Sequence, residues 1–186
     1  MQSAAGSALG KIVIRLSKIY GFRTINIVRG NANTAELKQL GADVVIETDS
    51  HAVLDEVFKA TGGRGVDYAM DCVGGDLASQ MIRCLTLSGH MVIFGTLAGE
   101  PISLPSRDMM MPVTKLSGFY AGNWLAQQSP LKLLGMVRKL GKLAQAGVFD
   151  SPVQAVFPLS EAAEAVAASQ IRGRVGKVLL NIGNTE

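Results

Sequence analysis

The chain has 186 residues, of which 48% are hydrophobic, 18% are charged and 21 are glycine, a composition typical of a packed α/β protein rather than a disordered or fibrous one. Its net charge of +3 comes from scattered basic residues, which argues against nucleic-acid binding. No apolar run is long enough to cross a bilayer, the N-terminus lacks a signal-peptide pattern, and Cys72 and Cys84 form neither a disulfide framework nor a metal motif. We therefore expect a protein that works in solution, in a reducing compartment such as the cytoplasm.

The predicted elements of the first half alternate between short apolar runs and helical patterns, which is typical of a parallel sheet built from βαβ units. Only Met1–Ser3 precede the turn that opens the first helix, so the strand expected before that turn is almost absent. The fold class is therefore α/β, a doubly wound parallel (Rossmann) sheet whose first strand is largely missing. We expect helices at 8–20, 33–40, 51–60 and 76–87, with Ser50 capping the third, and strands at 23–28, 43–47, 65–73 and 90–95.

Beyond Gly95 the pattern changes. Prolines at both ends of 101–105 suggest a short edge strand, and 113–119 is predicted to be a sixth core strand. An amphipathic helix over 130–146 is followed by the apolar run 152–159, a helix at 161–170 and a strand at 176–182. We divide the chain into a dinucleotide-binding domain, 1–128, and a connecting helix with a C-terminal segment, 129–186.

The turn "AGSALG" before the first helix has the spacing of a dinucleotide-binding turn, with Ala5, Ser7 and Gly10 at its small-residue positions. Small residues there let the backbone approach a pyrophosphate, whose charge is met by amide N–H groups at the helix N-terminus. The alternative is a plain packing turn between a strand and a helix. The βαβ context favours the phosphate site.

The end of the next strand bears on the choice of cofactor. An acidic residue about 20 positions beyond the turn would bind the ribose of NAD, whereas an arginine suits the 2′-phosphate of NADP. Arg29 stands there, and no Asp or Glu occurs between Thr24 and Thr34. The pattern favours NADP, although an ordinary exposed arginine after a strand remains the alternative.

Other polar residues are weaker candidates. Asp67 and Asp71 share strand parity, but nothing else indicates an acid pair, so a structural role is favoured. Cys72 has no local base and is expected to be a buried thiol. Glycine-containing junctions after three strands, at 71–75, 94–99 and 118–124, lie where open α/β sheets bind ligands.

Five stretches in order resemble the C-terminal half of a medium-chain dehydrogenase/reductase, and more narrowly the zinc-free branch of quinone reductases and 2-enoyl thioester (enoyl-CoA/enoyl-ACP) reductases. They are "AAGSALGKIVIRLSKIYGFRTINIVR", "GVDYAMDCVGG", "VIFGTLAGEPISLP", "SGFYAGNW" and "PLSEAAEAVAAS…GRVGKVLLNI". The resemblance implies reduction of an activated C=C bond or a quinone by NADPH, usually in a homodimer, with a small-molecule substrate and no nucleic-acid or membrane partner.

The resemblance also implies cofactor contacts, but no catalytic residue and no metal ligand. Asn31 departs from it, because close relatives tend to carry a second basic residue there. The implied contacts are Gly6, Ser7, Ala8 and Leu9 at the pyrophosphate; Arg29, Gly30 and Asn31 at the 2′-phosphate; Phe94, Gly95, Thr96 and Leu97 with Phe119, Tyr120, Ala121 and Gly122 along the nicotinamide half; and Lys177.

Such enzymes carry a catalytic domain before the nucleotide domain, so we expect this chain to be a fragment that is inactive alone. In relatives the stretch from about Ser151 packs on that domain, so here another chain is expected to bury it, or it is poorly ordered. The hypotheses are an enoyl thioester reductase, a quinone or enone reductase, and a non-catalytic nucleotide-binding module. The compartment is the cytoplasm or, alternatively, the mitochondrial matrix.

Overall fold

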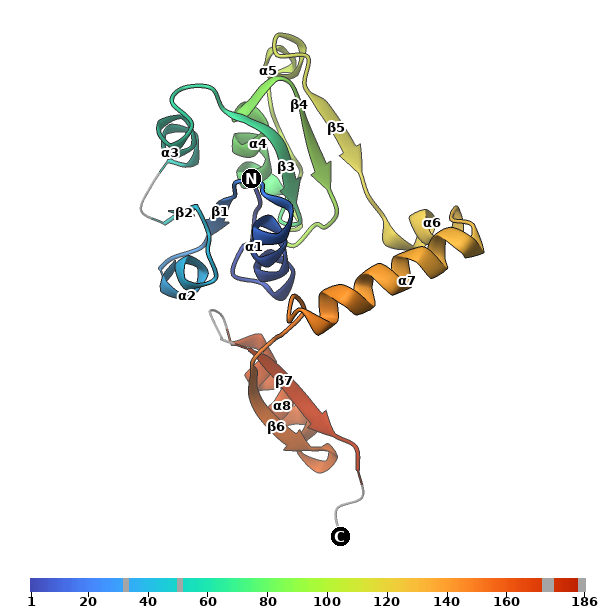
Figure 1. Ribbon diagram of the computed structural model, residues 1–186. Helices are drawn as coiled ribbons and strands as arrows, with labels where there is room; N and C mark the ends of the chain where they lie inside the picture. The colour runs from blue at the N-terminus through green and yellow to red at the C-terminus, as the bar shows by residue number, and fades with distance from the viewer. Residues whose placement is uncertain (32–33, 50–51, 172–175, 184–186) are drawn as a thin grey trace. The chain divides into compact units, whose positions relative to one another are not determined.

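The computed structural model describes residues 1–31, 34–49, 52–171 and 176–183. The chain divides into two compact units, Met1–Leu140 and Gly141–Glu186 (Figure 1). This division falls within the long helix α7 (Pro130–Gln145), whereas the boundary predicted at 128/129 lies just before that helix. The functional assignment of the two domains stays a prediction.

The first unit is built on a parallel sheet whose centre is formed by the first residues of the chain. Gln2 pairs in parallel with Asn26 on one side and with Met70 on the other. Its N–H donates to the carbonyl of Ile25 at 2.9 Å, and the N–H of Ser3 donates to the carbonyl of Met70 at 3.1 Å. Residues 1–3 thus stand in the place of the missing first strand.

The strands follow a doubly wound order around these residues (Figure 1), which confirms the predicted fold class. Strand β1 pairs with β2 on one side, and β3–β4–β5 continue the sheet on the other. The strands are β1 (Ile25–Val28), β2 (Val44–Glu47), β3 (Val66–Asp71), β4 (Leu85–Ile93) and β5 (Lys115–Gly118). The helices of this unit, besides α7, are α1 (Ala8–Tyr20), α2 (Thr34–Gln39), α3 (Val53–Ala60), α4 (Gly75–Arg83), α5 (Ser106–Met110) and α6 (Ala121–Ala126).

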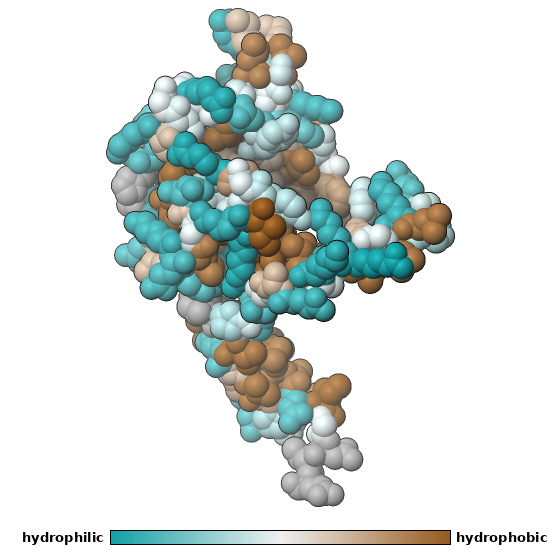
Figure 2. Space-filling view, in the orientation of Figure 1, coloured by the Kyte–Doolittle hydropathy of each residue, from teal (hydrophilic) through white to brown (hydrophobic). Residues whose placement is uncertain are grey.

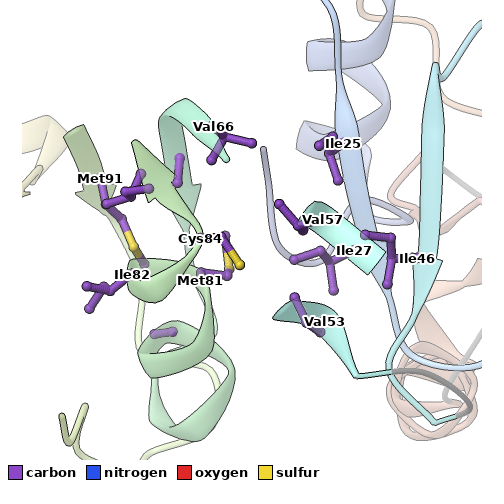
Figure 3. Close-up of a cluster of buried hydrophobic side chains, with 13 residues drawn as sticks. Ile25, Ile27, Ile46, Val53, Val57, Val66, Met81, Ile82, Cys84 and Met91 are labelled. Atoms are coloured by element: carbon purple, nitrogen blue, oxygen red, sulfur yellow. The ribbon is translucent and has the colours of Figure 1, made fainter. Parts of the chain in front are cut away.

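The core packs the sheet against its helices in two clusters. The larger one combines side chains of α3 and α4 with those of β1, β2, β3 and β4, and Val57, Met81, Ile82 and Ile27 are almost completely buried in it (Figure 3). The smaller cluster joins α1 and α2 to β1 and includes the fully buried Ile14. Burial on both faces explains why the strands are continuous apolar runs.

One predicted helix boundary and one predicted strand are wrong. The fourth helix ends at Arg83 rather than at 87, because the carbonyl of Cys84 accepts the N–H of Val66 and the backbone there joins the sheet. Gly89 therefore lies inside β4.

Residues 101–105 form no strand, because this segment packs on α4 instead of pairing with the sheet. The N–H of Ser103 donates to the Ser79 hydroxyl at 3.1 Å. The predicted cap Ser50 and the predicted helix starts at residues 33 and 51 lie outside the described residues.

The second unit contains two parallel strands and a helix: β6 (Val153–Pro158), a 3-10 turn (Leu159–Glu161), α8 (Ala162–Gln170) and β7 (Lys177–Asn181). Apolar side chains gather on its surface (Figure 2), among them Val153, Val156, Leu179, Leu180 and Ile182. The burial of this surface by another chain stays a prediction. Within the described ranges, no helix combines the length and apolar character that a membrane span requires.

Candidate functional site

The turn before α1 presents unpaired backbone donors. The N–H of Ala5 donates to the carbonyl of Ile27 at 3.0 Å, which fixes the turn at the carboxyl end of β1. Ser7 is the N-cap of α1, and its Oγ accepts the N–H of Gly10 at 3.1 Å. The N–H groups of Gly6, Ala8 and Leu9 donate to no acceptor among the described residues. Free N–H donors at the positive end of a helix dipole can form an anion-binding site.

Gly10 allows α1 to lie directly on this turn. A Cβ atom built on Gly10 would lie 2.6 Å from the carbonyl carbon of Ala5, a separation that real Cβ atoms do not show. A larger residue at this position would push α1 away from the turn. The next residue, Lys11, is buried and forms an ion pair with Glu36 of α2 at 2.7 Å, so its charge is already matched within the fold.

The segment after β1 lies at the same edge of the sheet. Arg29 is exposed and forms no ion pair with any residue that the structure describes. Gly30 has a φ of +61°, and a Cβ added there would lie 3.4 Å from a carboxylate oxygen of Asp49. Asp49 could not be recognised from the sequence near Arg29, because it follows the neighbouring strand β2.

The loop after β4 is tied to the end of β3. The N–H of Leu97 donates to the carbonyl of Cys72 at 3.0 Å, and a Cβ on Gly95 would lie 2.8 Å from the same oxygen. The N–H of Cys72 in turn donates to the hydroxyl of Ser3 at 3.1 Å. The predicted segment Phe94–Leu97 therefore lies next to the turn that begins at Ser3, and Leu97 itself is exposed.

The segment after β5 reaches the same edge. The N–H of Phe119 donates to the carbonyl of Ile93 at 2.8 Å, at the end of β4. Tyr120 is exposed and is the N-cap residue of α6, which starts with the predicted pair Ala121 and Gly122. The rings of Phe119 and Trp124 pack with their centroids 6.3 Å apart.

Lys177 is the one predicted contact in the second unit. It opens β7, its side chain is exposed, and its N–H donates to the carbonyl of Pro152 at 2.7 Å. Its role toward a cofactor stays a prediction. The "GRV" stretch just before it lies outside the described residues.

The two aspartates of β3 have separate environments, which supports the structural interpretation. Asp71 is fully buried, and its carboxylate accepts the N–H groups of Val73 at 3.1 Å and Gly74 at 2.8 Å. Asp67 is at the surface, where it pairs with Arg64 at 2.9 Å. In the described part of the chain, no group of three His, Cys, Asp or Glu side chains could hold a metal.

The two cysteines differ in burial, and we expect them to differ in reactivity. Burial raises the pKa of Cys84 to about 12. Burial also raises the pKa of Cys72, but the hydrogen bond from Ser3 opposes that change and the thiol is only half-buried. Because only the thiolate reacts, iodoacetamide at pH 8 should modify Cys72 about tenfold or more faster than Cys84. Mass spectrometry of timed digests measures the ratio of the two modification rates. In urea, the two cysteines should react at equal rates. Equal rates in the native protein would contradict the prediction.

Comparison with known proteins places these features in a family. Residues 8–137 match the zinc-binding dehydrogenase family. The mitochondrial enoyl-[acyl-carrier-protein] reductase of Rattus norvegicus is 30% identical over 176 residues, which cover 91% of this chain and 46% of that protein. The corresponding protein of Caenorhabditis elegans is 33% identical over 151 residues, with 78% and 42% covered. The chain thus spans about half the length of the curated relatives it matches.

Solved structures agree with this placement. A crystal structure described as an NADPH:quinone reductase from Bacillus thuringiensis matches with a TM-score of 0.87 at 30% identity, over 95% of this chain and 54% of that one. The Escherichia coli quinone oxidoreductase crystallised with NADPH shares the fold, with a TM-score of 0.83 at 24% identity over 96% and 55% of the two chains. The sequence match and the shared sheet together show that the chain belongs to the zinc-binding dehydrogenase family, within the medium-chain dehydrogenases/reductases.

Proposed function

We propose that this chain is the cofactor-binding part of an NADPH-dependent oxidoreductase that reduces the activated C=C bond of a 2-enoyl thioester. One observation carries the cofactor assignment: the unpaired N–H groups of Gly6, Ala8 and Leu9 lie at the point where the strand order reverses, with Arg29 after the adjacent strand. Diphosphate fits the first feature and a 2′-phosphate fits the second.

Each proposed segment has a separate task. Ser7 keeps the N-terminus of α1 in place, while the amides around it bind the pyrophosphate. Arg29, Gly30 and Asn31 surround the 2′-phosphate. The loops Phe94–Leu97 and Phe119–Gly122 hold the nicotinamide and exclude water from it. When bound, NADPH supplies the hydride that reduces the alkene.

Zinc does not enter this proposal. The family description names the metal, but the described residues offer it no ligand set. They also offer no convincing proton donor, since Tyr120 belongs to the cofactor side of the proposed site. Proton transfer would therefore depend on residues outside the described part of this chain.

The cofactor assignment is tested by an Arg29→Ala variant. Removing the guanidinium takes away a charge-assisted hydrogen bond to the 2′-phosphate, so NADPH binding should weaken about tenfold while NADH binding stays unchanged. Titration of nicotinamide fluorescence measures both affinities. Arg64→Ala, which removes another exposed charge, one that is paired with Asp67, is the control and should bind both cofactors as the parent does. Equal affinity of the parent chain for NADPH and NADH would reject the NADP assignment.

The substrate class rests on the relatives. The enoyl-[acyl-carrier-protein] reductases are 30% and 33% identical to this chain, which favours a 2-enoyl thioester. The Bacillus thuringiensis structure, matched at 30% identity, supports a quinone as the second candidate. Assays of the complete protein with crotonyl-CoA and with a quinone separate the two.

We further propose that the protein forms a homodimer. The names of the enoyl reductases favour the mitochondrial matrix over the cytoplasm as its compartment.

A further inference from the structure

A network of hydrogen bonds between buried polar side chains lies beneath the turn that carries the proposed pyrophosphate site. The side-chain amide of Gln2 donates to the carbonyl of Gly10 at 3.0 Å and to Oδ1 of Asn26 at 2.7 Å. Asn26 donates through Nδ2 to Oγ1 of Thr24 at 2.9 Å and to the carbonyl of Val44 at 2.9 Å. Asn26 is fully buried, while Gln2 and Thr24 are 3% exposed. Three buried polar side chains in the middle of a sheet are costly unless all of them are paired.

Asp43, at the surface end of this network, determines which group donates and which accepts in each of its hydrogen bonds. Thr24 reaches the carboxylate of Asp43 at 3.2 Å, and an ionised carboxylate can only accept. The hydroxyl of Thr24 must therefore donate to Asp43, which leaves it to accept from Asn26. The oxygen of Asn26 then faces Gln2, whose amide N–H groups are directed at Asn26 and at Gly10.

The other end of the network is Gly10, in the first turn of α1, which packs on the turn that carries the proposed pyrophosphate site. The carbonyl of Gly10 accepts from Gln2, and Gly10 itself lies against Ala5. The network thus joins α1 to β1 and to the central residues 1–3 at one point. The free N–H groups of Ala8 and Leu9 are two residues and one residue before Gly10, respectively.

We propose that Asn26, acting through Gln2, is a positioning residue that fixes the N-terminus of α1 for the cofactor's pyrophosphate. This inference rests on the proposed NADPH site. It assigns Asn26 no contact with the cofactor, because the side chain is fully buried within the sheet. The adenosine end of the cofactor would bind at Arg29, after β1, and not at the N–H groups of α1, so we expect its binding to depend less on the position of Gly10.

The test replaces both amides with apolar side chains of similar shape, Gln2→Met with Asn26→Leu. Removing both amides together leaves neither of them buried without a partner, and Thr24 keeps its hydrogen bond to Asp43 at 3.2 Å, so the double variant should fold. NADPH binding should weaken about tenfold, whereas adenosine 2′-monophosphate, which lacks the pyrophosphate, should bind with unchanged affinity. Fluorescence titration and calorimetry measure the two affinities. A general loss of structure would weaken the binding of both ligands.

The control is Val57→Ala, which removes buried volume from α3. Compared at a temperature where both variants are folded, it should bind NADPH as the parent does. Parental affinity for NADPH in the double variant would overturn the positioning role while leaving the proposed function intact. Equal weakening of both ligands would overturn it as well. A parent chain that binds neither ligand would instead reject the proposed function itself.

Discussion

A Gly10→Ala variant is expected to lose both stability and NADPH binding. The added Cβ would lie 2.6 Å from the carbonyl carbon of Ala5, and its other two nearest neighbours are also backbone atoms of Ala5. Backbone cannot yield as a flexible side chain can, so α1 must move away from the turn. Overpacking of this kind costs about 1–3 kcal/mol. Alanine would otherwise favour the helix by about 1 kcal/mol, so the clash decides the sign.

Urea unfolding followed by circular dichroism measures the stability, and fluorescence titration measures NADPH binding. The matched control is Gly135→Ala in α7, where a Cβ would meet no atom within 4 Å. That variant should be unchanged or up to about 1 kcal/mol more stable, and it should bind NADPH normally. A Gly10→Ala variant that matched the parent in both measurements would show that the close approach of α1 to the turn is not required.

The parts of the site that the sequence predicted are those set by local spacing. The turn before the first helix, with its small residues Ala5, Ser7 and Gly10, lies within one short stretch, and in the structure Gly10 packs against Ala5. The N-cap role of Ser7 was not predicted, and contact of this turn with a pyrophosphate stays a prediction. The junctions at 94–99 and 118–124 were predicted because parallel strands bring their carboxyl ends to one edge. Hydrogen bonds from Leu97 to Cys72 and from Phe119 to Ile93 place both junctions at that edge, while their contact with a nicotinamide stays a prediction.

The sequence did not predict features that depend on contacts between distant segments. The helix predicted to reach 87 ends early because Cys84 pairs with Val66, and the pattern at 101–105 could not show that Ser79 would hold that segment away from the sheet. The polar network was missed for a similar reason. Asn26 stands inside an apolar run, and its partner Gln2 lies in a different strand of the sheet.

We expect an Asp71→Ala variant to have the second large effect. The carboxylate is fully buried and accepts the N–H groups of Val73 and Gly74, which shapes the turn after β3. Removing it leaves two backbone donors without an acceptor, at a cost of about 2–4 kcal/mol. The same turn begins with Cys72, whose carbonyl holds Leu97, so NADPH binding should weaken as well.

The contrast with Asp67 makes this prediction specific. Asp67 is on the same strand but is exposed and paired only at the surface, so Asp67→Ala should change the stability by no more than about 0.5 kcal/mol. Asp71→Asn retains one acceptor oxygen in place, so its loss should fall between those of the two alanine variants. Urea unfolding of the three variants gives the order directly. Equal losses of stability at Asp67 and Asp71 would mean that burial of the carboxylate does not determine its contribution.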